Sequence, residues 1–232
     1  GHGDVVNPKM FKGIDNGVMD EPAITYWTLG AADGDKWRTG LAWPLPKQRL
    51  EDWYFNPGPS GTVASANDGS LSAQAPAGDG RDDLLVDYGA TAGGVSRWGN
   101  SMSVRTCAFE ACGDSASQPD MAANDAHGLT YTSEPLAADL EVTGHPVARL
   151  WVTSSAGDGD FFVYLEEVLP GGRSQYVTEG MLRASHRALH EPAWDTFGLP
   201  WHRGNAGDLA PLPPGEPAEL VIGLQPTSNI FD

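Results

Sequence analysis

Basic residues are scarce in this sequence, in which 14 Lys and Arg stand against 31 Asp and Glu and give a formal net charge of −17. Phosphate groups attract the opposite sign of field, so we expect no nucleic-acid partner and no membrane-surface partner. Long apolar runs are also missing, because no stretch approaches the roughly 20 apolar residues that span a bilayer. We expect neither an anchor nor a signal peptide. We therefore expect a soluble protein, and the sequence does not distinguish a cytoplasmic protein from an exported one.

Cysteine is nearly absent. Cys107 and Cys112 lie in a stretch rich in Gly, Ser and Ala. The pair suits a small disulfide loop if the protein is exported, and two free thiols are the alternative. A structural zinc site needs about four convergent ligands, and no second Cys pair exists to supply them. We therefore expect no metal and no cofactor.

The sequence motifs of common catalytic sites are missing too. An α/β-hydrolase serine sits in a Gly-x-Ser-x-Gly turn, where small neighbours avoid collision, and no such pentapeptide occurs. Ser60 and Ser101 are near misses without the spacing, and we interpret both as turn residues. The glycine-rich loops that cradle phosphates are absent as well, which argues against nucleotide binding.

Glycine and proline are abundant, with 29 Gly and 18 Pro spread without a period, and this composition favours turns and short strands. Short runs rich in β-branched and aromatic residues predict strands at 22–29, 53–55, 62–64, 84–88, 140–143, 147–153, 161–168, 175–182 and 218–224. The clearest hairpin joins residues 160–168 to 175–179 through a Gly-containing loop. Weak helical character is confined to 8–17 and 183–190, and long loops are expected at 57–83 and 112–126. We predict one mainly β domain, an antiparallel sandwich.

Few titratable residues form a pattern that indicates chemistry. Glu166 and Glu167 are neighbours on a predicted strand and point to opposite faces, so they cannot flank one bond; we expect one to face solvent and the other to lie near an edge. Asp158 and Asp160 could contribute to a calcium site, but the spacing falls short of a full loop, and turn acids before a strand are the favoured interpretation.

The histidines also give no strong signal. A helix would place His186 and His190 on one face as two metal ligands, but the sequence offers no third ligand. His127, His145 and His202 lie in loop-like contexts, where a lone His usually satisfies a backbone carbonyl.

Several blocks resemble one known family, and they follow its order along the chain. The most specific is Asp-Ala-His-Gly-Leu-Thr-Tyr-Thr-Ser-Glu-Pro-Leu at 125–136, continuing to 147. Others lie at 11–22, 86–88, 96–98, 160–168, 177–185, 212–217 and 224–231. Together they resemble the C-terminal domain of the cocaine-esterase and X-Pro dipeptidyl-peptidase hydrolases over nearly the whole chain.

The resemblance implies a galactose-binding-like jelly roll over residues 22–232, preceded at 1–21 by a linker from an α/β-hydrolase domain. It implies that this domain packs on that catalytic partner and helps to form the substrate cleft. The family's catalytic serine and aspartate lie upstream of this sequence. His2, which precedes the block at 11–22, is the one candidate for the family histidine, and a cloning remnant is the alternative.

The family usually continues beyond the Pro-Thr-Ser-Asn-x-Phe block with another strand, whereas this sequence stops at Asp232. A missing last strand leaves a sheet edge that another chain could pair with.

Three functions remain open. The first is a non-catalytic accessory domain of a serine ester or amide hydrolase. The second is an independent carbohydrate- or ligand-binding module, for which eight tryptophans could supply platforms. The third is an esterase with an unrelated nucleophile. An exposed coplanar indole pair favours the second, and one apolar patch with a polar border favours the first.

Overall fold

The longest strands form where β-branched and aromatic residues are concentrated, in the second half of the chain. The computed structural model describes residues 17–90 and 120–232. In it, β8 (Asp160–Val168) and β9 (Ser174–Arg183) form an antiparallel hairpin. Gly171 and Gly172 make the turn at φ angles of 100° and 85°, which favour glycine. The predicted hairpin is confirmed.

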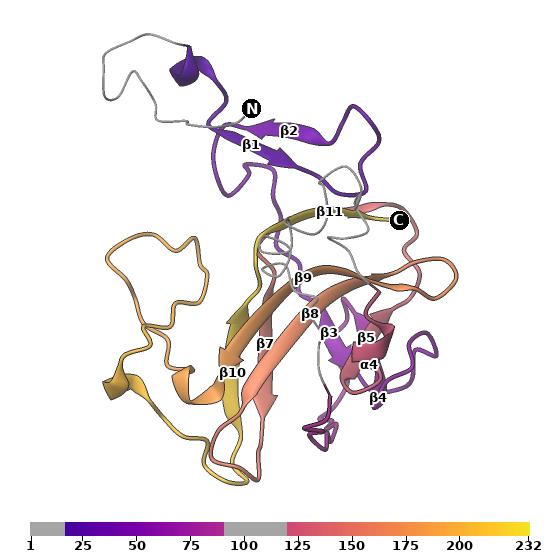
Figure 1. Ribbon diagram of the computed structural model, residues 1–232, viewed down its shortest axis with the longest axis vertical. Helices are drawn as coiled ribbons and strands as arrows, with labels where there is room; N and C mark the ends of the chain where they lie inside the picture. The colour runs from indigo at the N-terminus through magenta and orange to yellow at the C-terminus, as the bar shows by residue number, and fades with distance from the viewer. Residues whose placement is uncertain (1–16, 91–119) are drawn as a thin grey trace.

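The core lies between this hairpin and a second antiparallel pair, β7 (Val147–Val152) and β10 (Ala218–Gly223). Every second residue of β10 points inward, as a period of two requires. Leu220 and Ile222 are fully buried there and pack with Leu182 of β9. Figure 1 shows the four strands side by side. Each such apolar side chain contributes about 1.5–3 kcal/mol when it leaves water.

A close backbone approach joins β9 to β10. A Cβ atom on Gly180 would lie 2.7 Å from the carbonyl oxygen of Gly223, so only glycine fits. Next to this contact the hydroxyl of Thr178 donates to the carbonyl of Gln225 at 2.8 Å. The two pairs therefore form one continuous packed unit, which is here called the closed half.

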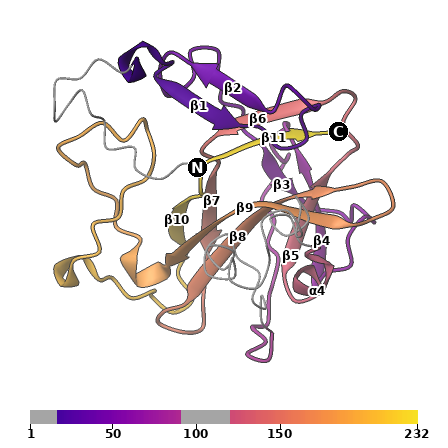
Figure 2. The same cartoon turned by 45° about the horizontal axis from the view of Figure 1, so that its top comes forward.

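The remaining strands form three smaller groups. β1 (Ile24–Trp27) pairs with β2 (Trp37–Gly40), and β6 (Leu140–Gly144) pairs with β11 (Thr227–Phe231). β4 (Asn67–Ser72) lies between β3 (Tyr54–Asn56) and β5 (Leu129–Ser133), antiparallel to the first and parallel to the second. Figure 2 shows the β1–β2 hairpin beside β6 and β11. The open half is defined here as β1 to β5 with their connections.

A buried hydroxyl relay ties the β1–β2 hairpin to β11 and β6. The hydroxyls of Thr28 and Ser228 lie 2.9 Å apart, and that of Ser228 lies 2.7 Å from Thr143. Backbone bonds from Leu29 to Ser228 and from Ile230 to Leu29 add two further links.

Helices are short. They are α4 (Ala122–Asp125) and the 3₁₀ turns η1 (Val18–Asp20), η3 (Ala184–His186) and η4 (Ala206–Asp208). Within the described ranges no helix is long and apolar enough to cross a membrane.

The predicted mainly β sandwich is confirmed, and the differences are local. Residues 62–64 and 84–88 form no strand, and residues 183–190 form one 3₁₀ turn rather than a helix. The expected loop at 57–83 contains β4, and the described end of the loop at 112–126 contains α4. β2, β5 and β11 were not predicted. The sequence of β4, Asn-Asp-Gly-Ser-Leu-Ser, has no strand pattern, so its pairing with two neighbours decides its structure.

Candidate functional site

Ser60 is a turn residue, as predicted. Its hydroxyl donates to Asp68 at 2.6 Å, and the same carboxylate accepts the amide of Gly61 at 2.7 Å. Across residues 17–90 and 120–232, no hydrogen bond joins a serine hydroxyl to a histidine ring. Ser101 and His2 lie outside the described residues, so the assignment of His2 stays a prediction.

The histidines serve local packing. The Nε2 atom of His202 lies 2.9 Å from the carbonyl oxygen of Val221, which is the carbonyl contact expected for such a residue. His190 lies 3.4 Å from Asp208. His186 lies in η3, and no helix extends from it to His190, so the shared helical face does not exist.

Two further histidines hold loops. His127 lies 3.4 Å from the carboxylate of Asp87, and the His145 ring packs edge-on against Trp43. Burial lowers the pKa of His145. Among the described residues, neither ring is hydrogen-bonded to a serine hydroxyl.

Asp158 and Asp160 form contacts that stabilise the open end of the β8–β9 hairpin, and they do not converge on a cation site. Asp158 accepts the amides of Ser185 and Gly159 at 2.9 Å, and Asp160 forms a two-bond ion pair with Arg183 at 2.8 Å. In the part of the chain that the structure describes, no group of three or more His, Cys, Asp or Glu could hold a metal. Cys107 and Cys112 lie outside that part.

Glu166 and Glu167 point in opposite directions, as predicted, but neither faces solvent, so that expectation is wrong. Glu167 accepts the amide of Asp232 at 3.0 Å, and Asn229 lies at 3.4 Å. Glu166 accepts the hydroxyl of Ser174 at 2.6 Å. Neighbouring residues cover this end of β8, with Ser174 beside Glu166 and with Asn229 and Asp232 beside Glu167, which a prediction from the sequence alone could not reveal.

Asp125 of α4 faces Glu166 and was not anticipated. It is only 5% exposed and lies within hydrogen-bonding reach of Glu166 and Ser174. Its Oδ2 atom has no donor among the described residues. Burial raises the pKa of Glu166 to about 7, the Ser174 hydroxyl opposes the rise, and the charge of Asp125 adds to it. Burial also raises the pKa of Asp125. A proton bound by either carboxyl group would remove the repulsion between them, and we infer that the pair binds one.

Two indole pairs lie at the surface, and both are edge-to-face. Trp27 and Trp37 meet at 79° with ring centres 5.0 Å apart, and Trp194 and Trp201 meet at 71° and 5.2 Å. Lys36 lies over the Trp27 ring. Neither pair offers two coplanar faces.

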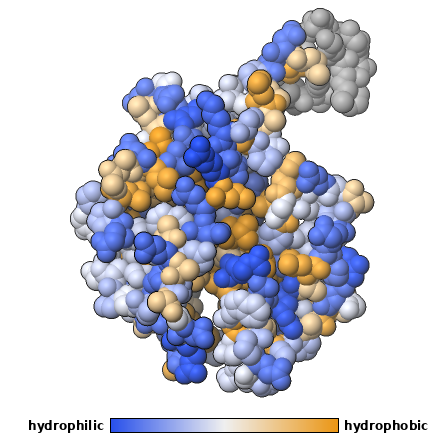
Figure 3. Space-filling view, turned by 180° about the vertical axis from the view of Figure 1, so that it is seen from behind, coloured by the Kyte–Doolittle hydropathy of each residue, from blue (hydrophilic) through white to orange (hydrophobic). Residues whose placement is uncertain are grey.

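The most extensive feature is apolar surface on the open half. Large apolar side chains that remain exposed there include Trp37, Leu41, Leu50, Trp53, Tyr54, Phe55, Leu84, Leu85, Val86 and Tyr88. Single exposed apolar residues are ordinary, but a contiguous set marks an interaction site. Figure 3 shows apolar side chains gathered in a hollow with hydrophilic residues around it.

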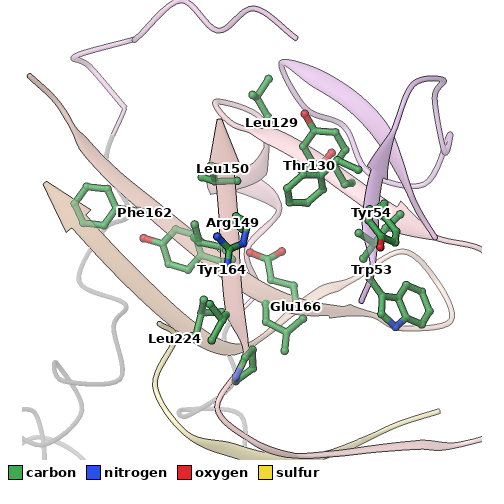
Figure 4. Close-up of a pocket in the computed structure, with 18 of the residues that line it drawn as sticks. Trp53, Tyr54, Leu129, Thr130, Arg149, Leu150, Phe162, Tyr164, Glu166 and Leu224 are labelled. Carbon is green, nitrogen blue, oxygen red and sulfur yellow. The ribbon is translucent and has the colours of Figure 1, made fainter. Parts of the chain in front are cut away.

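The hollow is too large for a small-molecule pocket. It encloses about 4210 Å³, whereas ligand pockets hold about 300–1,000 Å³. Figure 4 shows that its walls come from different sheets: Trp53 and Tyr54 at the start of β3, Leu129 and Thr130 of β5, Arg149 and Leu150 of β7, and Phe162, Tyr164 and Glu166 of β8. A surface of this size and composition fits a protein segment better than a substrate.

Residues 16–232 match the family described as the X-Pro dipeptidyl-peptidase C-terminal non-catalytic domain. The chain belongs to this family. The resemblance found in the sequence blocks is thereby confirmed.

Relatives of this C-terminal domain carry hydrolase names. A protein of Mycobacterium bovis named "Putative serine esterase" is 40% identical over 95% of the chain, and so is its Mycobacterium tuberculosis counterpart. Cocaine esterase of Rhodococcus sp. strain MB1 is 28% identical over 95% of the chain. The chain spans about a third of the length of these curated relatives, namely 32% and 33%.

Solved structures share the fold. A CocE/NonD family hydrolase from Staphylococcus aureus matches 97% of the chain and 34% of its own length, with a TM-score of 0.57 and 17% identity. An aminopeptidase from a marine sediment archaeon of the Thaumarchaeota matches 97% of the chain and 33% of its own length, with a TM-score of 0.62 and 22% identity. At these identities the likeness concerns the fold.

Proposed function

We propose that this domain packs on the α/β-hydrolase domain of a serine hydrolase of the ester, amide or X-Pro peptide type and shapes its substrate cleft. Two thirds of the length of the named esterase relatives lies outside the stretch that this chain matches, which leaves room for a catalytic domain. The domain itself adds binding surface and no reacting group.

The observation that carries this proposal is the apolar surface of the open half. Leu50, Trp53 and Phe55 remain exposed close together in the sequence. In the closed half the inward-facing apolar side chains form the core, while others, such as Trp151 and Phe162, remain exposed. Domains that keep such a surface in water lose hydrophobic free energy that a partner domain would recover. An accessory domain bound to a catalytic core accounts for that surface.

Carbohydrate binding is the weaker alternative. A sugar ring stacks on a flat aromatic face, and an extended platform needs coplanar rings. The described indole pairs meet at 79° and 71°, which supports docking over sugar binding.

The test compares hydrolysis of a p-nitrophenyl acyl ester by the 232-residue chain and by a two-domain protein in which an α/β-hydrolase domain precedes it. A serine-reactive phosphonate is added to both. We expect turnover and labelling only in the two-domain protein. Stoichiometric labelling of one serine in the chain alone contradicts the proposal and favours the esterase alternative.

A further inference from the structure

Residues 81–88, here called the arm, form no strand, although their sequence, Arg-Asp-Asp-Leu-Leu-Val-Asp-Tyr, contains the β-forming run for which a strand was expected. The arm ends in a turn, in which the carbonyl of Asp87 accepts the amide of Ala90. Within the described part of the chain, residues 81–86 make no backbone hydrogen bond. Their N–H and C=O groups have no backbone partner among the described residues, as a segment that pairs with another sheet edge requires.

Side chains fix the arm near both ends. Near the start, Tyr131 of β5 donates its hydroxyl to Asp82 at 2.6 Å. The Tyr131 ring lies over Gly69 and stacks on Phe55 with ring centres 4.3 Å apart, so its position is set by the sheet. Burial, together with the Asp82 carboxylate, raises the pKa of Tyr131 well above its usual range. Near the far end, Asp87 lies 3.4 Å from His127.

Between these anchors the apolar side chains face water. Leu85 is 92% exposed, and Leu84 and Val86 are also exposed. Tyr88, directly after the second anchor, is 96% exposed. The two neighbouring acids do not compete with them, because Asp83 pairs with Arg81 and Asp82 with Tyr131. An arm held at both ends keeps its apolar residues presented, and less ordering entropy is lost when they bind.

We propose that the arm contacts the α/β-hydrolase domain, by adding its backbone to a sheet edge or lying in an apolar groove of that domain. This inference rests on the proposed function. The choice of partner rests on length. Two thirds of the named relatives lies outside the matched stretch, so in those relatives a further part of the same polypeptide is available as a partner. Extended segments with free backbone groups and apolar side chains bind in this way.

The first experiment measures amide hydrogen exchange in the isolated chain and in the two-domain protein. We expect the amides of residues 84–88 to exchange at least about tenfold more slowly in the two-domain protein, because bound backbone groups open less often. Equal rates in the two proteins overturn the arm's role.

The second experiment uses Leu85→Asp with Leu209→Asp as its matched control, since Leu209 is 48% exposed and lies outside both the arm and the apolar surface of the open half. Leu85→Asp is expected to abolish the slower exchange and to lower kcat/KM in the two-domain protein by about tenfold, roughly the cost of one poorly seated anchor. Leu209→Asp should change neither. The isolated chain should unfold at the same temperature in all three forms, which shows that the variants fold.

Calorimetry of the two-domain protein separates the two proposals. If its domains unfold independently, each at the temperature of its isolated form, docking itself fails. If they unfold together while the arm amides stay unprotected, the proposed function stands and the arm proposal is wrong.

Discussion

The closed half buries Leu220 and Ile222 completely between two strand pairs, whereas the open half leaves Phe55, Trp37 and Leu85 in contact with water. The closed half contains the two longest strands, β8 and β9. The difference lies in packing, because an apolar core fills the space between β7–β10 and β8–β9, while β3 and β5 lie along an open hollow to which β7 and β8 also contribute residues. We infer that the closed half supplies the folding free energy and that the open half supplies the contact surface.

The largest effect should come from the closed half. Leu220→Ala removes a side chain with 0% exposure and leaves a cavity, so the free energy of unfolding should fall by about 3 kcal/mol. Urea unfolding followed by circular dichroism measures it. Leu50→Ala in the open half is the control and should cost less than about 0.5 kcal/mol. Equal losses at the two positions would break the comparison.

The next effect concerns pH. In the unfolded chain Glu166 has its ordinary pKa of 4.5, and in the folded chain burial raises its pKa to about 7. The folded state therefore binds more protons between these values, and stability falls as pH rises from 4.5 to 7. We expect a loss on the order of 2 kcal/mol between pH 5 and pH 8.

Replacing the carboxyl group tests the cause of this loss. Glu166→Gln keeps an acceptor for the Ser174 hydroxyl and supplies a donor for the Asp125 carboxylate. The variant should therefore be more stable than the parent at pH 8, and its free energy of unfolding should change less with pH. Glu219→Gln, on the exposed pair with Arg149, is the control and should keep the parent's pH dependence. If Glu166→Gln also keeps it, the pair of Asp125 and Glu166 does not bind the inferred proton.

A smaller effect should appear where the two regions are tied together. Thr28 has 0% exposure, and its hydroxyl bonds that of Ser228 at 2.9 Å. Thr28→Val keeps the shape and removes the bond, which should cost about 1 kcal/mol. Faster exchange of the Leu29 and Ile230 amides would show that the β1–β2 hairpin opens first. Thr25→Val, at an exposed position of β1, should leave both amides unchanged.

Sequence reasoning succeeded where β-forming residues and turn residues agree. The β8–β9 hairpin has both, with β-branched and aromatic residues on each side of Pro170, Gly171 and Gly172. β4 has neither, and its pairing with β3 and β5 is a tertiary effect that no local pattern carries. Residues 84–88 show the converse, since a β-forming sequence there pairs with no strand among the described residues.

For the candidate site, the sequence predicted which catalytic groups are missing but not which residues are buried or lie in contact. The missing nucleophile elbow indicated an accessory domain, and the turn role of Ser60 followed from its neighbours. The Asp125–Glu166 contact joins α4 to β8, positions far apart in sequence, so burial had to be seen before either carboxylate could be assigned. The arm's exposure likewise depends on what packs against it rather than on its composition.

The smallest expected effect, at Trp151, is the strictest test of the difference between the closed half and the open half. Trp151 lies on β7 directly after Leu150, but on the outer face, where it is 68% exposed. A buried Trp→Ala change costs about 3–5 kcal/mol. Trp151→Ala in the isolated chain should cost less than about 0.5 kcal/mol, since the side chain loses only its cross-strand contact with Glu219. Thermal unfolding of the isolated chain measures it. A loss above 1 kcal/mol would mean that exposed aromatic residues already stabilise the isolated fold. The exposed side chains of the open half would then need no partner domain to explain them.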